Sequence, residues 1–155
     1  MLQTPKIYIA APINALSFDA AKERNQIIAE RLILSGFQPL DPLHPIGNKL
    51  SGHEGDLDLK ARQHHGITSF DIVNGCLDMI GRCDGVLVYL QGFKAARTPT
   101  WGTPMEMMFA HVHKKMVISV VDDYHSAWID VFSRKVSTIE AAIALFSELK
   151  QPSVA

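Results

Sequence analysis

Short apolar runs alternate with longer amphipathic segments along most of the chain. Four continuous or nearly continuous apolar runs lie at residues 6–10, 37–40, 86–90 and 115–121, and such runs are typical of strands buried on both faces. Between and after them, apolar residues recur at helical spacing in the segments 17–35, 71–82, 105–112 and 139–149. Strands that alternate with helices indicate a parallel sheet wound on both faces.

The pattern therefore predicts an α/β fold built as a single domain over residues 1–155, with a doubly wound, flavodoxin-like parallel sheet of about five strands and helices on both faces. Gly36 marks the end of the first helix, and Pro39 suggests that the second strand lies at an edge of the sheet. Ser137 to Glu140 has the form of a capping box that opens the last helix. The segment 41–68 shows no clear period, and we expect a loop or partly helical lid over the substrate.

Composition excludes several classes of function. Apolar residues make up 47% of the 155 residues, and the formal net charge of −1 gives no general attraction for nucleic acid or anionic membranes. The chain shows no leader pattern and no apolar run that approaches the ~18 residues needed to span a bilayer, so we expect a cytoplasmic protein. Cys76 and Cys83 share one apolar helical face, and their spacing is not that of the cysteine ligands of a structural metal site. We therefore expect both to be reduced core residues.

Ligands of open parallel sheets bind beyond the carboxyl ends of the strands, so the loops that follow the strands are the candidate site. The loop 11–15 after the first strand is small and tightly turned, and it leaves room for a sugar or phosphate to approach the backbone. The chain has neither the glycine-rich dinucleotide fingerprint nor the phosphate-loop pattern at this place. No NAD or ATP site is therefore indicated, and the histidine spacings do not favour a metal.

The segment 98–106 is the most informative of these loops. A helix begins here at the ligand edge, where its free amides and positive end favour anionic oxygen. Glu106 lies one turn into that helix and is placed to face the crevice. Thr103 to Glu106, with Pro104 at the first helical position, also fits a capping box, in which the glutamate only stabilises its helix. The motif alone leaves both interpretations open.

The ordered set of motifs resembles the nucleoside 2-deoxyribosyltransferase family, including the related nucleoside 5′-monophosphate N-glycosidases. The segments that carry the resemblance are 7–11, 83–88, 102–106, 109–110 and 115–118, and the resemblance covers about residues 6–123, most of the chain. The resemblance implies that Glu106 is the catalytic nucleophile and that Tyr8, on the first strand, contacts it. Two acidic residues of the family fall on Cys76 and Thr100 in this chain, with Asp78 near the first of them.

The resemblance implies cleavage of the N-glycosidic bond of a (deoxy)nucleoside, with transfer of the deoxyribosyl group to another base through a covalent intermediate on Glu106. No cofactor or metal is expected, the substrate is a nucleoside or nucleotide, and a homo-oligomer, a dimer or larger, is implied. Candidate substrate-binding residues are Ala11, Ile13, Asn14, Asp78, Thr100, Trp101, Gly102 and Thr103.

Two other functions remain open at this point. The first is a nucleoside 5′-monophosphate N-glycosidase, a hydrolase in which Thr100 and the loop at Asn14 bind phosphate. The second is a non-catalytic nucleotide-binding module on the same fold, in which Glu106 only caps its helix. The altered acidic positions keep both alternatives in view.

Overall fold

The computed structural model describes residues 3–12, 16, 18–43, 69–92, 102–122 and 126–150 of the chain. In chain order the elements are β1 (Lys6–Ala10), α1 (Phe18–Leu34), β2 (Gln38–Leu40), α4 (Ser69–Arg82), β3 (Gly85–Tyr89), α5 (Gly102–Val112), β4 (Met116–Val120), α6 (Ala127–Phe132), β5 (Arg134–Val136), α7 (Ile139–Phe146) and the 3-10 helix η1 (Ser147–Lys150). No helix of the described part is long and apolar enough to cross a membrane.

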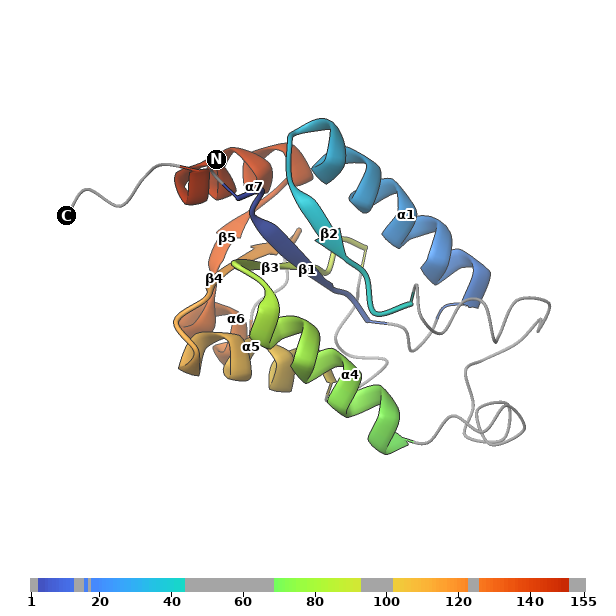
Figure 1. The fold of residues 1–155 in the computed structure, drawn as a ribbon. Coiled ribbons are helices and arrows are strands. Elements are labelled where there is room, and N and C mark those ends of the chain that lie inside the picture. Colours follow the sequence, from blue (N-terminus) through green and yellow to red (C-terminus); the bar gives the residue numbers. More distant parts are fainter. Residues whose placement is uncertain are drawn as a thin grey trace.

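The strands form one five-stranded parallel sheet in the order β2-β1-β3-β4-β5. Helices α1 and α7 cover one face of the sheet, and α4, α5 and α6 cover the other (Figure 1). This confirms the predicted α/β class, the strand number and the helices on both faces. The order also matches the flavodoxin-like arrangement, in which a crevice opens at the carboxyl edge where the winding reverses.

Each face of the sheet has its own hydrophobic core, because successive side chains of a strand point to opposite faces. On β1, Ile7 and Ile9 pack with α1 and α7, whereas Tyr8 and Ala10 pack toward α4 and α5. These four of the five residues of β1 are at most 1% exposed. Burial on both faces explains why the central strands read as continuous apolar runs.

Most predicted elements lie where the sequence placed them, with ends that differ by a few residues. Pro39 lies in the edge strand β2, as predicted. The last helix is capped differently from the prediction: Thr138 is the N-cap residue, and its side chain accepts a hydrogen bond from the amide of Ala141. Glu140 instead forms an ion pair with Arg31 of α1.

Helix α6 and strand β5 are not predicted by the pattern of apolar residues. Helix α6 has six residues and β5 has three, of which Arg134 and Lys135 are exposed. Neither is long enough to show a clear hydrophobic period. The expected lid within 41–68 lies almost wholly outside the described residues, as do most of the loop 91–102 and the tail after Lys150.

Candidate active site

Glu106 and Tyr8 meet on the α4–α5 side of the sheet, although they are 98 positions apart in the chain. The Tyr8 hydroxyl donates a hydrogen bond to Oε1 of Glu106 over 2.7 Å. Tyr8 is fully buried in the middle of β1, whereas Glu106 is only partly buried. A rigid central strand therefore fixes the carboxyl group of Glu106 and leaves part of the residue open to solvent.

Helix α5 carries Glu106 to this place. Its buried residues Thr103, Met107 and Ala110 recur at helical spacing and pack the helix onto β3 and β4. Because α5 begins at Gly102, Thr103 lies inside the helix and not at its N-cap. The carboxyl group of Glu106 bonds to a tyrosine on another element, and the capping-box interpretation of this motif does not describe the structure.

A third polar side chain, the thiol of Cys76 on α4, lies against the same pair. Cys76 is partly buried and packs on the core cluster that contains Tyr8. Its thiol contributes to the pKa shifts of both Tyr8 and Glu106. The two cysteines are free, in agreement with the sequence prediction, but Cys76 belongs to the polar cluster, whereas the thiol of Cys83 donates to the carbonyl of Ile80.

Burial shifts the pKa of all three groups upward. Desolvation raises the pKa of Glu106 above 4.5, and hydrogen bonds from Tyr8 and Cys76 act in the opposite direction. Burial, followed by the negative charge of Glu106, raises the pKa of Cys76 to about 11. The same two causes, in the same order, place the pKa of Tyr8 well above its ordinary value. At neutral pH the cluster thus has two protonated donors around one carboxyl group.

The structure brings some of the predicted substrate-binding residues toward this cluster. Ala11 follows β1 directly, and Gly102 and Thr103 form the first turn of α5, one turn before Glu106. Asp78 does not join them: it is exposed and forms an ion pair with Arg82. Two positions along a helix differ by about 200°, so Asp78 points away from the side on which Cys76 meets Glu106. Four further candidates lie outside the described residues, namely Ile13, Asn14, Thr100 and Trp101.

A polar network that was not predicted from the sequence lies at the carboxyl ends of β1 and β2. The buried Asn25 of α1 donates to Asp41 over 2.7 Å, and Asp41 also accepts from the amide of Leu43 over 3.0 Å. Arg24 donates to the carbonyl of Pro12 over 2.8 Å. These bonds hold the chain segments that leave the two strands. A buried asparagine within an apolar helical face was the signal for such a network.

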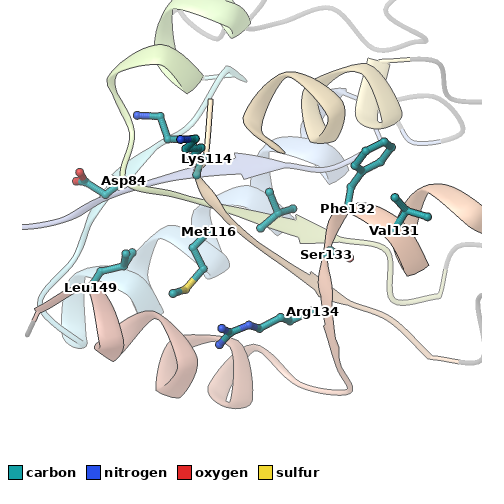
Figure 2. A pocket seen from close by; sticks show the side chains of 10 residues that line it. Asp84, Lys114, Met116, Val131, Phe132, Ser133, Arg134 and Leu149 are labelled. Carbon is teal, nitrogen blue, oxygen red and sulfur yellow. The ribbon is translucent and has the colours of Figure 1, made fainter. Parts of the chain in front are cut away.

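A hollow lies elsewhere on the molecule, away from Glu106 and Tyr8. It is lined by residues at the amino ends of β3, β4 and β5, including Asp84, Met116 and Arg134 (Figure 2). Arg134 is paired with Glu148, and Lys115 donates to the carbonyls of Gly81 and Cys83. Ligands of open parallel sheets bind at the opposite, carboxyl edge. The hollow therefore does not form part of the site around Glu106.

The fold and the hydrogen-bonded pair of Tyr8 and Glu106 define a small doubly wound α/β protein in which a strand of the sheet holds a partly buried carboxyl group of α5. Residues 7–150 match the family model of nucleoside 2-deoxyribosyltransferase. The chain belongs to this family. None of the curated proteins matches the chain in sequence.

Solved structures share the fold at low sequence identity. A 2-deoxyribosyltransferase from Bacillus psychrosaccharolyticus is 17% identical, with a TM-score of 0.57 over 89% of this chain and 90% of that one. A 2-desoxiribosyltransferase from Leishmania mexicana is 21% identical, with a TM-score of 0.56 over 93% and 97%. The CMP N-glycosidase BcmB from Clostridium botulinum is 14% identical, with a TM-score of 0.50 over 92% and 98%.

Proposed function

We propose that the protein cleaves the N-glycosidic bond of a (deoxy)nucleoside and transfers the deoxyribosyl group to another base, with Glu106 as the nucleophile. The observation that carries this proposal is the carboxyl group of Glu106, held by Tyr8 at the carboxyl edge of the sheet in a chain that the family model matches. A carboxylate beneath the anomeric carbon stabilises the positive charge that develops on the sugar as the C–N bond breaks.

The chemistry consists of two displacements at C1′. In the first, an oxygen of Glu106 forms a bond to C1′ while the bond from C1′ to the base breaks, and the base leaves with the electron pair and takes up a proton. In the second, another base attacks C1′, the bond to Glu106 breaks and the carboxylate is restored. When water attacks in place of the second base, the products are those of a hydrolase.

The substrate lies, in this proposal, between the loop after β1 and the amino end of α5. Ala11 and the first residues of α5, Gly102 and Thr103, flank the approach to Glu106. The free amides at the start of α5 suit an oxygen-rich ligand. The predicted contacts from Ile13, Asn14, Thr100 and Trp101 belong to the same proposal.

A chromatographic assay of base release tests the proposal. The wild-type chain is incubated with deoxynucleosides and with nucleoside 5′-monophosphates, each with and without a second base. We expect free base from at least one class and a new nucleoside when the acceptor is present. Glu106→Gln keeps the shape of the side chain and removes the nucleophile, so turnover falls by at least about 1000-fold, as for a residue that acts in the chemical step.

The outcome separates the three functions. Base release without a new nucleoside identifies the hydrolase, with the monophosphates as its expected substrates. Nucleotide binding without base release by the wild-type chain identifies a non-catalytic module. Full turnover by Glu106→Gln contradicts the assignment of the nucleophile, whatever the substrate.

We also propose that the protein forms a homo-oligomer, a dimer or larger. Large apolar side chains are exposed on the helices of the layer that carries Glu106, namely Phe70, Val73, Met105, Met108, Val112, Trp128 and Val131. Monomeric proteins rarely leave extensive apolar patches exposed. Light scattering on the purified chain gives the number of subunits, and a monomer at assay concentration contradicts this part of the proposal.

A further inference from the structure

Two adjacent polar residues of α1 connect the chain segments that follow β1 and β2. The guanidinium of Arg24 donates to the carbonyl of Pro12 over 2.8 Å and to the side-chain oxygen of Asn25 over 3.0 and 3.2 Å. The side-chain nitrogen of Asn25 donates in turn to Oδ1 of Asp41 over 2.7 Å. The same oxygen accepts from the backbone amide of Leu43 over 3.0 Å. The bonds thus form one continuous network from Pro12 to Leu43.

Asn25 is the residue on which this network depends. It is only 1% exposed, so water is not an alternative partner for its side chain. Its oxygen accepts from Arg24, and its nitrogen donates to Asp41. An apolar side chain at this position would leave both neighbours without the bond, and an unpaired polar group beside the core costs more than the bond itself contributes.

The network lies at the crevice between β1 and β3. Pro12 follows Ala11, which flanks the approach to Glu106 in the proposed function. Arg24 also lines a second, smaller hollow of about 220 Å³ together with Tyr89, the last residue of β3. The two strands are neighbours in the sheet, and ligands of such sheets bind where the winding reverses between them. Arg24 therefore lies at one border of the crevice, on the face opposite to α5 (Figure 1).

We propose that Arg24 and Asn25 are positioning residues for substrate binding, which hold the segments after β1 and β2 in the arrangement that receives the nucleoside or nucleotide. This inference rests on the proposed function. Arg24 acts through Pro12, and Asn25 acts through Asp41. A surface formed by two chain segments binds a ligand tightly when both are fixed beforehand, because ordering them during binding weakens the affinity.

The inference predicts an effect on affinity and not on the chemical step. Tyr8 and Glu106 bond to each other on the α4–α5 side of the sheet, outside the network. Loss of the network should therefore raise KM and leave the acid limb of the kcat profile in place. A network that only stabilises the fold would lower the free energy of unfolding and leave the affinity of the folded chain unchanged.

Isothermal titration calorimetry on Glu106→Gln measures the affinity without turnover. The ligands are the four common deoxynucleosides and their 5′-monophosphates. We expect the added changes Arg24→Gln and Asn25→Leu each to raise the Kd by ~10-fold, the scale of one hydrogen bond to a charged group. Arg24→Lys retains a positively charged donor and recovers part of the affinity.

Arg31→Gln is the matched control for Arg24→Gln. Arg31 lies on the same helix, but it forms an exposed ion pair with Glu140 of α7 and takes no part in the network. We expect this variant to leave the Kd unchanged. An equal rise of the Kd in Arg31→Gln and Arg24→Gln would overturn the inference, because the network would then not be the cause.

Amide hydrogen exchange at Leu43 tests the network without any ligand. The amide donates to Asp41, whose carboxyl group Asn25 holds. We expect Asn25→Leu to accelerate this exchange by ~10-fold, because the segment opens locally more often. Asn25→Asp keeps the size of the side chain and its acceptor for Arg24, but it lacks the donor to Asp41. It should accelerate the exchange as well, and it keeps the test decisive when Asn25→Leu does not fold.

The outcomes separate this inference from the proposed function. An unchanged Kd in both Arg24→Gln and Asn25→Asp overturns the positioning role, even when these variants unfold more easily. The absence of binding by every one of the ligands overturns it too. Base release by the wild-type chain tests the proposed function separately. If ligand binds and no base is released, the proposed function fails, and the comparison of Kd values still decides the inference.

Discussion

The protonation state of Glu106 is decided by its immediate neighbours. Burial raises the pKa of its carboxyl group above 4.5, and the bonds from Tyr8 and Cys76 counteract part of that rise. Because the ionised form is the nucleophile, activity falls as pH decreases through this raised pKa. The same shift bears on stability: a carboxyl group with a raised pKa in the folded state costs stability when it is ionised, above the folded pKa.

The stability cost of ionising Glu106 predicts how Glu106→Gln behaves. The amide carries no charge, so the variant avoids the cost that the wild-type chain bears at neutral pH. We expect Glu106→Gln to be at least as stable as the wild-type chain at pH 7, with the difference disappearing as pH falls below the ordinary pKa of a glutamate. Denaturant unfolding at several pH values measures it. A variant that is clearly less stable at pH 7 contradicts this account of the carboxyl environment.

Tyr8→Phe tests the hydrogen bond to Glu106. The change removes the hydroxyl that donates over 2.7 Å and leaves the ring in the core. A hydrogen bond to a charged group contributes about 1.5–3 kcal/mol, so we expect kcat/KM at neutral pH to fall by ~10–100-fold and the acid limb to move to higher pH. Tyr89→Phe is the matched control, since Tyr89 packs on the opposite core. Equal profiles for the two variants would remove Tyr8 from the mechanism.

Gly85, at the start of β3, lies where the core leaves no space for a side chain. A Cβ atom at Gly85 would lie 2.7 Å from Cε1 of Phe146 in α7 and 3.2 Å from Cδ1 of Ile7 in β1. The sheet and α7 thus approach each other through the missing side chain of Gly85. Gly75, within α4, has nothing within 4 Å of the corresponding position.

These two glycines predict stability changes of opposite sign. Gly85→Ala overpacks the core and lowers the free energy of unfolding by about 1–3 kcal/mol. Gly75→Ala removes a flexible residue from a helix interior and raises it by about 0.5–1 kcal/mol. Chemical denaturation of the two variants beside the wild-type chain checks both values. An unchanged stability in Gly85→Ala would contradict the close packing of α7 on the sheet, and destabilisation by Gly75→Ala would contradict the open space at Gly75.

At the scale of the whole molecule, the winding of the chain gathers Tyr8, Cys76 and Glu106 from three elements into one cluster. The sequence predicts the alternation of strands and helices because buried parallel strands and amphipathic helices have different periods. It does not predict α6 and β5, which are too short to show a period, or the N-cap at Thr138, which lies one residue from an equally suitable serine.

The site was predictable to a smaller extent than the fold. Glu106 and Tyr8 were named because the motifs follow the family order, and the structure places them in contact. Asp78 was named because an acid was expected, yet the rotation of α4 turns Cys76 toward the core that contains Tyr8 and leaves Asp78 exposed, where it pairs with Arg82 of the same helix. That rotation is fixed by packing against the sheet, which spacing along the helix alone does not determine.

The central claim is that Glu106 forms a bond to the sugar. The most direct test is intact-protein and peptide mass spectrometry after rapid acid quench of the chain mixed with the nucleoside or monophosphate that supports base release. We predict a species heavier by one pentosyl group, located on the peptide that contains Glu106 and absent from Glu106→Gln. Base release without such a species at any quench time, or the same adduct on Glu106→Gln, would contradict the account.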